Sequence, residues 1–256
     1  MEQIPISDLV RVPFIHVLTY PKPNLRSAKG RISQLKKLEV EKIIFEGRTK
    51  IGRLGLVGIG TVGLVVKAEA RGEVYALKIR RTDANRESMD REYNLTQMAN
   101  RIGVGARVES RTRDFMLMQH VGGLEIDDWL KTVGGAGARG RANDMIHALL
   151  NQCRKMDIIN LDHGQLSNLR KHVVIIQEKP IILDFESASL TRRPKNVTTA
   201  AQYLLVGGRV STKIRRILGI RKADPILEAL AIYKRDMSDR NYAAVLRALH
   251  RRGPKL

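Results

Sequence analysis

A glycine-rich run is the first stretch of this sequence whose residue types could do chemistry. Residues 58–65 read Gly-Ile-Gly-Thr-Val-Gly-Leu-Val and match the pattern G-x-G-x-x-G-x-V through Gly58, Gly60, Gly63 and Val65. Glycines lack a Cβ, so a hairpin built from them can bring backbone amides close to a triphosphate. A dinucleotide-binding motif would continue into a helix, whereas the residues after the third glycine favour a strand. The run therefore predicts a phosphate-binding hairpin between two strands.

A lysine follows one strand later. Ala76 and Lys78 form an Ala-x-Lys sequence at the end of the next β-rich run. In protein kinases such a lysine neutralises the α- and β-phosphates of ATP and is held by a glutamate on the next helix. Glu92, in the middle of a helix expected at about residues 86–101, is the partner we favour. Glu87, near the start of that helix, is explained by the helix dipole.

Two methionines precede a change from apolar to flexible sequence at residues 119–123. In a kinase this segment would be the hinge between two lobes, and its backbone would meet the adenine base. We expect Met118 or Met116 to line that pocket. Filling of the core explains at least one of the two methionines.

A polar loop, a strand pair and an aspartate form a second candidate centre. Residues 160–168 read Asn-Leu-Asp-His-Gly-Gln-Leu-Ser-Asn, and two apolar runs then lead to Asp184. Kinases place a catalytic loop before such a hairpin and a metal-binding aspartate after it. Phosphoryl transfer needs Mg²⁺ on the phosphates and a residue that orients the nucleophile. Asp184 is the predicted Mg²⁺ ligand, and Asn168 is the second.

The catalytic position within this loop has two interpretations. If Asp162 is the carboxylate, it precedes Asn168 by six residues, against five in the protein-kinase pattern. If His163-Gly164-Gln165 stands where kinases have His-x-Asp, the catalytic position holds Gln165, which cannot take a proton. We favour Asp162 as the base, although a role in bracing the loop explains it nearly as well.

The elements that must position these residues follow from periodicity and turn signals. We expect strands at 42–46, 49–57, 62–70, 73–80, 107–108, 114–119, 173–176 and 181–183. We expect helices at 27–38 with Ser27 as N-cap, 86–101, 141–158, 196–206, 213–218, 225–235 and 239–251, with a loop at 134–140. This predicts an α+β fold.

In combination these motifs resemble one family. The sequence is similar to the predicted archaeal serine/threonine protein kinases related to the RIO kinases and to the kinase subunit of the KEOPS complex. The matching segments are 58–65, 76–86, 162–167, 184–189 and 193–198. The resemblance implies a bilobal protein-kinase-like fold, with an antiparallel N-lobe sheet and a small, mainly helical C-lobe, that uses ATP and Mg²⁺. The expected division is an extension at 1–40, an N-lobe at 41–120 and a C-lobe at 121–256.

The chain departs from the protein-kinase pattern in its acceptor region. Glu186 stands where a glycine is usual after Asp-Phe, and choline and aminoglycoside kinases also carry glutamate there. We expect an atypical serine/threonine protein kinase that phosphorylates itself or a protein acceptor. The alternatives are a nucleotide-binding ATPase or scaffold that acts on RNA or a ribonucleoprotein, and a small-molecule kinase.

The charge and aromatic content of the chain indicate which classes of partner it could bind. The formal net charge is +20 while aromatics make up 4% of residues, which favours phosphate contacts over base stacking. The RNA hypothesis assigns these contacts to Arg192, Arg193, Lys195, Arg247, Arg251, Arg252 and Lys255. An acidic protein acceptor or a solvated surface explains the same charges. Cys153 is the only cysteine and no apolar run is long enough to span a membrane, which predicts a cytoplasmic protein.

Overall fold

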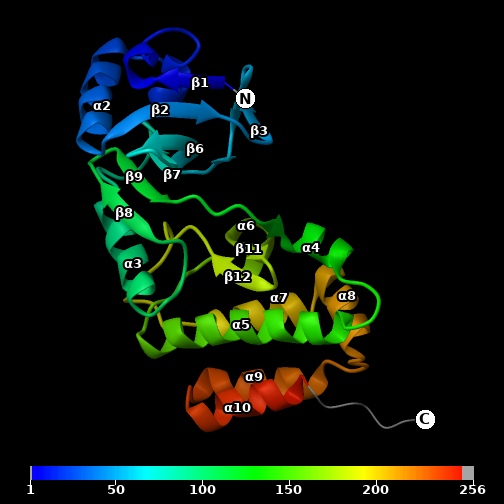
Figure 1. The fold of residues 1–256 in the computed structure, drawn as a ribbon. Coiled ribbons are helices and arrows are strands. Elements are labelled where there is room, and N and C mark those ends of the chain that lie inside the picture. Colours follow the sequence, from blue (N-terminus) through cyan, green and yellow to red (C-terminus); the bar gives the residue numbers. More distant parts are fainter. Residues whose placement is uncertain (1, 250–256) are drawn as a thin grey trace. The chain divides into compact units, whose positions relative to one another are not determined.

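The computed structural model describes residues 2–249 as an α+β chain of antiparallel sheets and helices (Figure 1). The chain divides into two compact units. The first contains the residues up to Gln97 together with Ala106–Val121, and the second contains Met98–Gly105 and the residues from Gly122 onward. The expected extension at 1–40 thus belongs to the first unit, and eight residues of the expected N-lobe belong to the second.

The first unit is organised around a seven-stranded antiparallel sheet. Its central path has the order β1-β2-β6-β7-β9-β8, and β5 pairs with β6. The strands are β1 (Glu2–Pro5), β2 (Val40–Phe45), β5 (Gly58–Ile59), β6 (Gly63–Ala70), β7 (Glu73–Arg80), β8 (Val108–Arg111) and β9 (Phe115–Gln119). A separate hairpin joins β3 (Thr49–Ile51) to β4 (Leu54–Leu56). The helical elements are η1 (Ile6–Asp8), α1 (Ile15–Leu18), α2 (Leu25–Lys37) and most of α3 (Asp90–Arg101).

One face of this sheet is covered by the first forty residues. Alternate residues of β6, β7 and β9, among them Leu64, Leu77 and Leu117, are fully buried in a cluster with Leu18 and Leu35. Because side chains alternate between the two faces of a strand, the intervening residues of β7 project from the other face. Lys78 is one of these residues, so the packed core fixes the direction in which it points.

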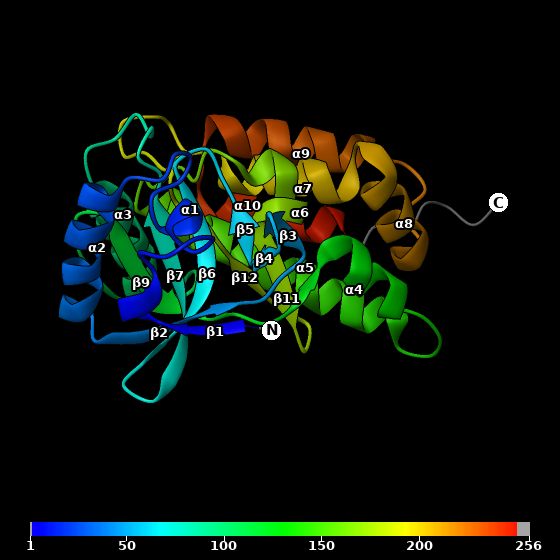
Figure 2. The same ribbon diagram turned by 90° about the horizontal axis from the view of Figure 1, so that it is seen from above.

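The second unit is mainly helical. It contains β10 (Leu124–Glu125), β11 (Val173–Ile176) and β12 (Lys179–Ile182), which form an antiparallel sheet in the order β10-β11-β12. Its helical elements are α4 (Ile126–Thr132), α5 (Ala138–Ile158), η2 (Leu166–Asn168), α6 (Leu169–His172), α7 (Asn196–Leu205), α8 (Gly208–Leu218), α9 (Asp224–Arg235) and α10 (Asp239–Ala248). The long helix α5 buries Ile146, Leu149 and Leu150, and it runs beside α7 in both views (Figures 1 and 2).

The structure confirms most of the predicted elements, including β6, β7, β11 and helices α5, α7, α9 and α10, within a few residues at their ends. Five details were wrong. The strand expected at 49–57 is the β3–β4 hairpin, which turns at Gly52 with φ +56°. The N-cap of α2 is Asn24, whose side chain accepts from the Ser27 amide at 2.8 Å.

The other three corrections concern helix starts. Residues 86–89 are not helical, because the Arg86 carbonyl accepts from Arg80 at 2.9 Å and the Met89 amide donates to Arg113 at 2.9 Å. Helix α5 begins at Ala138, inside the expected loop. Helix α8 begins at Gly208, five residues before the expected start at 213.

None of the helices found between residues 2 and 249 has both the length and the apolar composition that a membrane-spanning segment needs.

Candidate functional site

The glycine-rich run forms a tight hairpin between β5 and β6. The Gly60 amide donates to the Gly63 carbonyl at 2.8 Å, which leaves Thr61 and Val62 at the tip. Arg81 holds this tip through its amide, which donates to the Val62 carbonyl at 2.8 Å, and through its guanidinium, which donates to the Gly60 carbonyl at 3.3 Å. Sequence reasoning gave Arg81 no role, although it lies within the matching segment 76–86.

Gly63 is required by its neighbours. A Cβ there would lie 2.8 Å from the Ile79 carbonyl oxygen and 3.3 Å from two carbons of the Lys78 side chain. The third glycine of the motif thus leaves the space along which the Lys78 stem extends. A Cβ at Gly58 would meet no atom within 4 Å, so there is space for a side chain at that position.

Lys78 and Glu92 form a buried ion pair. The Lys78 Nζ lies 2.6 Å from Glu92 Oε1, and the side chains are 6% and 2% exposed. Glu92 is held in the first turn of α3, and Lys78 is fixed by its place in β7 between Val65 and Met116. Taking two charges out of water is costly unless geometry and further bonds compensate. A buried lysine–glutamate pair next to a glycine hairpin is therefore an arrangement that needs a reason beyond stability.

The sheet register gathers the remaining nucleotide candidates of this unit. Val65 pairs with Lys78, and Ala76 pairs with Met118. Directly opposed residues project on the same face of an antiparallel pair. The candidates Val65, Ala76, Lys78 and Met118 therefore share the sheet face opposite the packed core.

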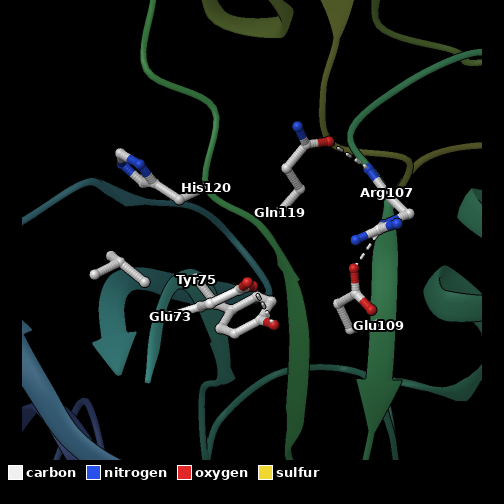
Figure 3. Close-up of a pocket in the computed structure, with 7 residues that line it drawn as sticks. Glu73, Tyr75, Arg107, Glu109, Gln119 and His120 are labelled. Atoms are coloured by element: carbon white, nitrogen blue, oxygen red, sulfur yellow. Dashed lines mark hydrogen bonds and ion pairs between the residues drawn. The ribbon is translucent and has the colours of Figure 1, made fainter. Parts of the chain in front are cut away.

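A pocket of about 440 Å³ lies elsewhere on this unit (Figure 3). It is lined by Glu73, Val74, Tyr75, Arg107, Glu109, Gln119 and His120. Tyr75 and Gln119 oppose each other and alternate with Ala76 and Met118, so they project on the core side of the sheet. None of the candidate residues from the sequence lines this pocket, and we do not assign it to the nucleotide.

In the second unit, Asp184 follows β12 in a strained turn. Its φ is +67°, a left-handed conformation that is uncommon for non-glycine residues and that clusters at functional sites. The side chain is 33% exposed, and its Oδ2 lies 3.7 Å from His172 Nδ1. A carboxylate oxygen of Asp184 and one of Glu186 lie within 4.8 Å of each other. Two hard oxygen donors at that spacing suit Mg²⁺, and Glu186 joins the candidates named from sequence.

His163 is a buried neutral residue behind this turn. Its Nε2 lies 3.0 Å from the Leu183 carbonyl, which can only accept, so Nε2 carries the proton. Burial lowers the pKa of His163 to about 4, despite the hydrogen bond to Leu183. The ring also meets Phe185 edge-on, with centroids 5.0 Å apart. His163 thus links the polar loop to the residues on both sides of Asp184.

Asp162, the favoured base, is 1% exposed. Its Oδ2 accepts from Arg192 Nε at 2.8 Å, and its backbone pairs with Ser189 in both directions. A buried carboxylate held by an arginine is poorly available to an acceptor, so the geometry favours the bracing role. Gln165 is half-buried, and its Oε1 has no hydrogen-bond partner among residues 2–249. Asn168 is exposed at the end of η2.

Sequence reasoning missed the residues that brace the polar loop from behind. Asn196 accepts from the His163 amide at 2.9 Å and donates to the Leu161 carbonyl at 2.7 Å. Asp157 accepts from the Asn196 side chain at 2.8 Å and from the Tyr233 hydroxyl at 2.9 Å. The only signal was the resemblance at 193–198, because the partners lie up to 76 residues apart in sequence.

Two of the arginines assigned to RNA already form hydrogen bonds within the protein. Arg192 bonds Asp162 and the Ser187 carbonyl, and Arg193 donates to the carbonyls of Lys234 and Arg235 at the end of α9. Lys195 and Arg247 lie within the described chain, whereas Arg251, Arg252 and Lys255 fall outside the described residues.

Comparison with known proteins gives one relationship. No family model matches the chain. Over 82 residues it is 30% identical to the uncharacterized protein MJ1211 of Methanocaldococcus jannaschii, and the match covers 32% of this chain and 70% of that protein. The chain belongs to the family of MJ1211. Because that relative is uncharacterized, the relationship assigns no activity, and the function has to be argued from the site.

Proposed function

We propose that this protein is an ATP-dependent phosphotransferase with a bilobal protein-kinase-like fold, most similar in plan to the RIO and KEOPS kinases. The observation that carries the proposal is the buried Lys78–Glu92 pair at 2.6 Å, beside a glycine hairpin whose Gly63 leaves room for the lysine stem. In kinases the same residue types hold the α- and β-phosphates of ATP. The single buried cysteine fits the cytoplasmic location that we propose with it.

Each unit offers residues that suit one part of the chemistry. Lys78, held by Glu92, would neutralise phosphate charge, while Val65, Ala76 and Met118 would pack against the base from the same sheet face. Asp184 and Glu186 offer the oxygen donors that would hold Mg²⁺, with Asn168 as a further candidate. Bound Mg²⁺ would neutralise charge that develops on the transferred phosphoryl group.

The acceptor position is the weakest match to a protein kinase. Asp162 is buried against Arg192, and the loop offers Gln165, which cannot accept a proton. This observation favours a second candidate, a nucleotide-binding ATPase or scaffold without an acceptor. We place serine/threonine transfer first, because phosphoryl transfer depends mainly on positioning and charge stabilisation rather than on a strong base.

Incubation with [γ-³²P]ATP and Mg²⁺ tests this assignment and separates the candidates. We expect the wild-type protein to label itself or an added protein, and Asp184→Ala to abolish labelling. Lys42→Met is the control, because Lys42 pairs with Glu69 at 2.9 Å in the same sheet but at its solvated surface. Release of free phosphate without labelling would favour the ATPase. Absence of ATP binding by the folded protein would rule out both.

A further inference from the structure

Helix α2 carries a basic face that the proposed chemistry does not use. Its exposed charged residues are Arg26, Lys29, Lys36 and Lys37, called the α2 basic stripe below. At 100° per residue these four side chains fall within a sector of about 120° that runs for roughly 16 Å along the helix. The helix contains no acidic residue, so the sector has a single sign of charge.

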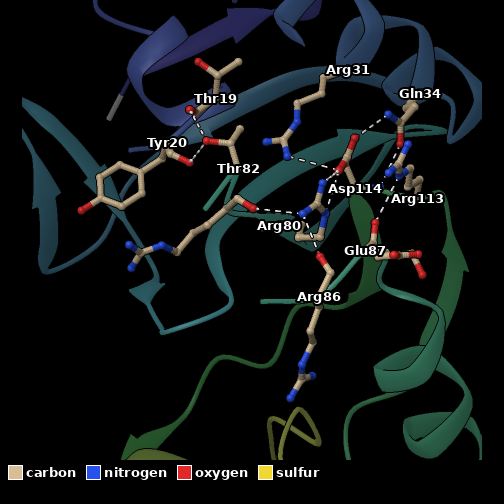
Figure 4. Close-up of polar contacts among 12 residues, drawn as sticks. Thr19, Tyr20, Arg31, Gln34, Arg80, Thr82, Arg86, Glu87, Arg113 and Asp114 are labelled. Carbon is tan, nitrogen blue, oxygen red and sulfur yellow. Dashed lines mark hydrogen bonds and ion pairs between the residues drawn. The ribbon is translucent and has the colours of Figure 1, made fainter. Parts of the chain in front are cut away.

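The opposite side of α2 is anchored, which fixes the direction of the stripe. Ala28, Arg31 and Leu35 are buried. Arg31 donates to the Leu18 carbonyl at 2.6 Å. It also donates to Asp114 at 3.2 Å (Figure 4). The stripe must therefore face outward, because a rotation of the helix would break these bonds.

Within the described part of the chain, the stripe has no counter-charge. Among residues 2–249, no ion pair or hydrogen bond involves the charged group of any of its four members, although the Lys29 carbonyl accepts from the Ser33 hydroxyl at 3.3 Å. The nearest acidic residue past the end of the helix, Glu39, lies 3.7 Å from Arg71. Four like charges on one face are mutually unfavourable, and an anionic partner would relieve that repulsion.

Small residues separate the charges. Gly30 and Ser33 lie between Lys29 and Lys36 on the same face, and a Cβ at Gly30 would meet no atom within 4 Å. Glycine within a helix is unfavourable relative to alanine, and nothing in the packing requires it here. Its absence of a side chain lowers the helix surface between the basic residues, so that a chain of phosphates can approach closely.

We propose that the α2 basic stripe binds the phosphate backbone of single-stranded RNA without reading its sequence. A protein partner is disfavoured, because protein interfaces rely on buried apolar or aromatic anchors. The exposed apolar side chain of α2 is Leu25, which lies at the first residue of the helix and so cannot anchor a partner along the stripe. A flexible strand can follow such a surface.

The test is a salt titration of RNA binding by the full chain. Binding is measured as the fluorescence anisotropy of a labelled RNA strand of about 20 nucleotides. Four phosphate contacts give a log–log slope near −2.8, so affinity should fall about fifty-fold between roughly 50 and 200 mM salt. We compare a variant with Arg26, Lys29, Lys36 and Lys37 changed to Gln. The matched control changes Lys50, Arg101, Lys179 and Arg240 to Gln, which removes the same charge from four exposed, dispersed positions.

We expect the α2 variant to lose about tenfold or more in affinity at low salt and most of the slope, while the control keeps a slope within about one unit of wild type. Thermal melts check that both variants fold. Equal binding by the two variants, or no binding by the wild type at about 50 mM salt, would overturn the proposal. Displacement of the RNA by polyglutamate at equal charge would overturn the choice of RNA over an acidic protein, and equally tight binding of duplex DNA would overturn the choice of a single strand. Binding is read without ATP, so the result does not depend on the proposed phosphoryl transfer.

Discussion

Removal of the Asp114 carboxylate should destabilise the first unit strongly. Asp114 accepts from Arg80 Nε at 2.8 Å, from Gln34 Nε2 at 2.7 Å and from Arg31 at 3.2 Å (Figure 4). Arg31 is 2% exposed, so Asp114→Ala would leave a buried guanidinium without its counter-ion. Breaking a buried ion pair from one side typically costs about 3–5 kcal/mol. We expect a loss of that size in the free energy of unfolding, measured by urea titration with circular dichroism.

The same cluster makes a prediction about pH. Burial raises the pKa of Asp114, but hydrogen bonds from Gln34 and Arg80 and the charges of Arg31 and Arg80 outweigh it, so the net pKa is lowered. A carboxyl whose folded pKa is below its unfolded value of about 3.9 stabilises the fold above that pH. Its contribution is lost as the pH falls through the folded pKa. The acid side of the stability profile should therefore be flatter in Asp114→Ala than in wild type.

Two further variants define how the result is interpreted. Asp83→Ala removes a carboxylate that pairs with Arg81 at 2.8 Å at the surface, and we expect little change. Arg31→Met combined with Asp114→Leu removes the buried Arg31–Asp114 pair but leaves Arg80 without its carboxylate partner, so we expect it to recover only part of the loss. If Asp114→Ala unfolds at the same urea concentration as Asp83→Ala, the reasoning about the buried cluster is refuted.

Three further predictions concern the candidate site. Gly63→Ala should lower ATP affinity about tenfold in calorimetry, since overpacking costs about 1–3 kcal/mol and the new Cβ would press on the Lys78 stem; unchanged affinity would contradict the role of Gly63. Because the pKa of His163 is lowered to about 4, the free energy of unfolding should fall by up to ~3 kcal/mol as the pH falls from about 6.5 toward 4. His163→Phe should remove that pH dependence of unfolding; a dependence equal to that of wild type would argue against a buried neutral imidazole. Asp162→Asn should lower the melting temperature by loosening Arg192, while Gln165→Ala should slow phosphoryl transfer more per folded molecule; the reverse order would restore Asp162 as the base.

Much of the first unit could be predicted from its sequence, because the signals there are local. Alternating apolar residues in β6 and β7 encode their own register, and the glycines mark the hairpin between β5 and β6. The errors arose where distant residues decide the local structure. Residues 86–89 carry helix-compatible side chains, yet bonds to Arg80 and Arg113 keep them out of a helix.

The candidate residues could be named from sequence, but their environments could not. The pattern placed Asp162 and Gln165 in one loop without showing that Asp162 is buried against Arg192, thirty residues away in sequence. The brace formed by Asn196 and Asp157 depends in the same way on the packing of α7 against α5. Lys78 and Glu92 were easier, because a strand followed by a helix brings them together over fourteen residues.

The central claim is that the Lys78–Glu92 pair serves phosphoryl transfer rather than stability. The most direct measurement is the single-turnover rate of ³²P transfer by the double variant Lys78→Met, Glu92→Leu. Apolar replacement of both partners of a buried ion pair is often neutral or stabilising, so the double variant should melt near or above the wild-type temperature. We predict that it folds in this way and transfers no phosphate, whereas a folded double variant with the wild-type transfer rate would contradict the account.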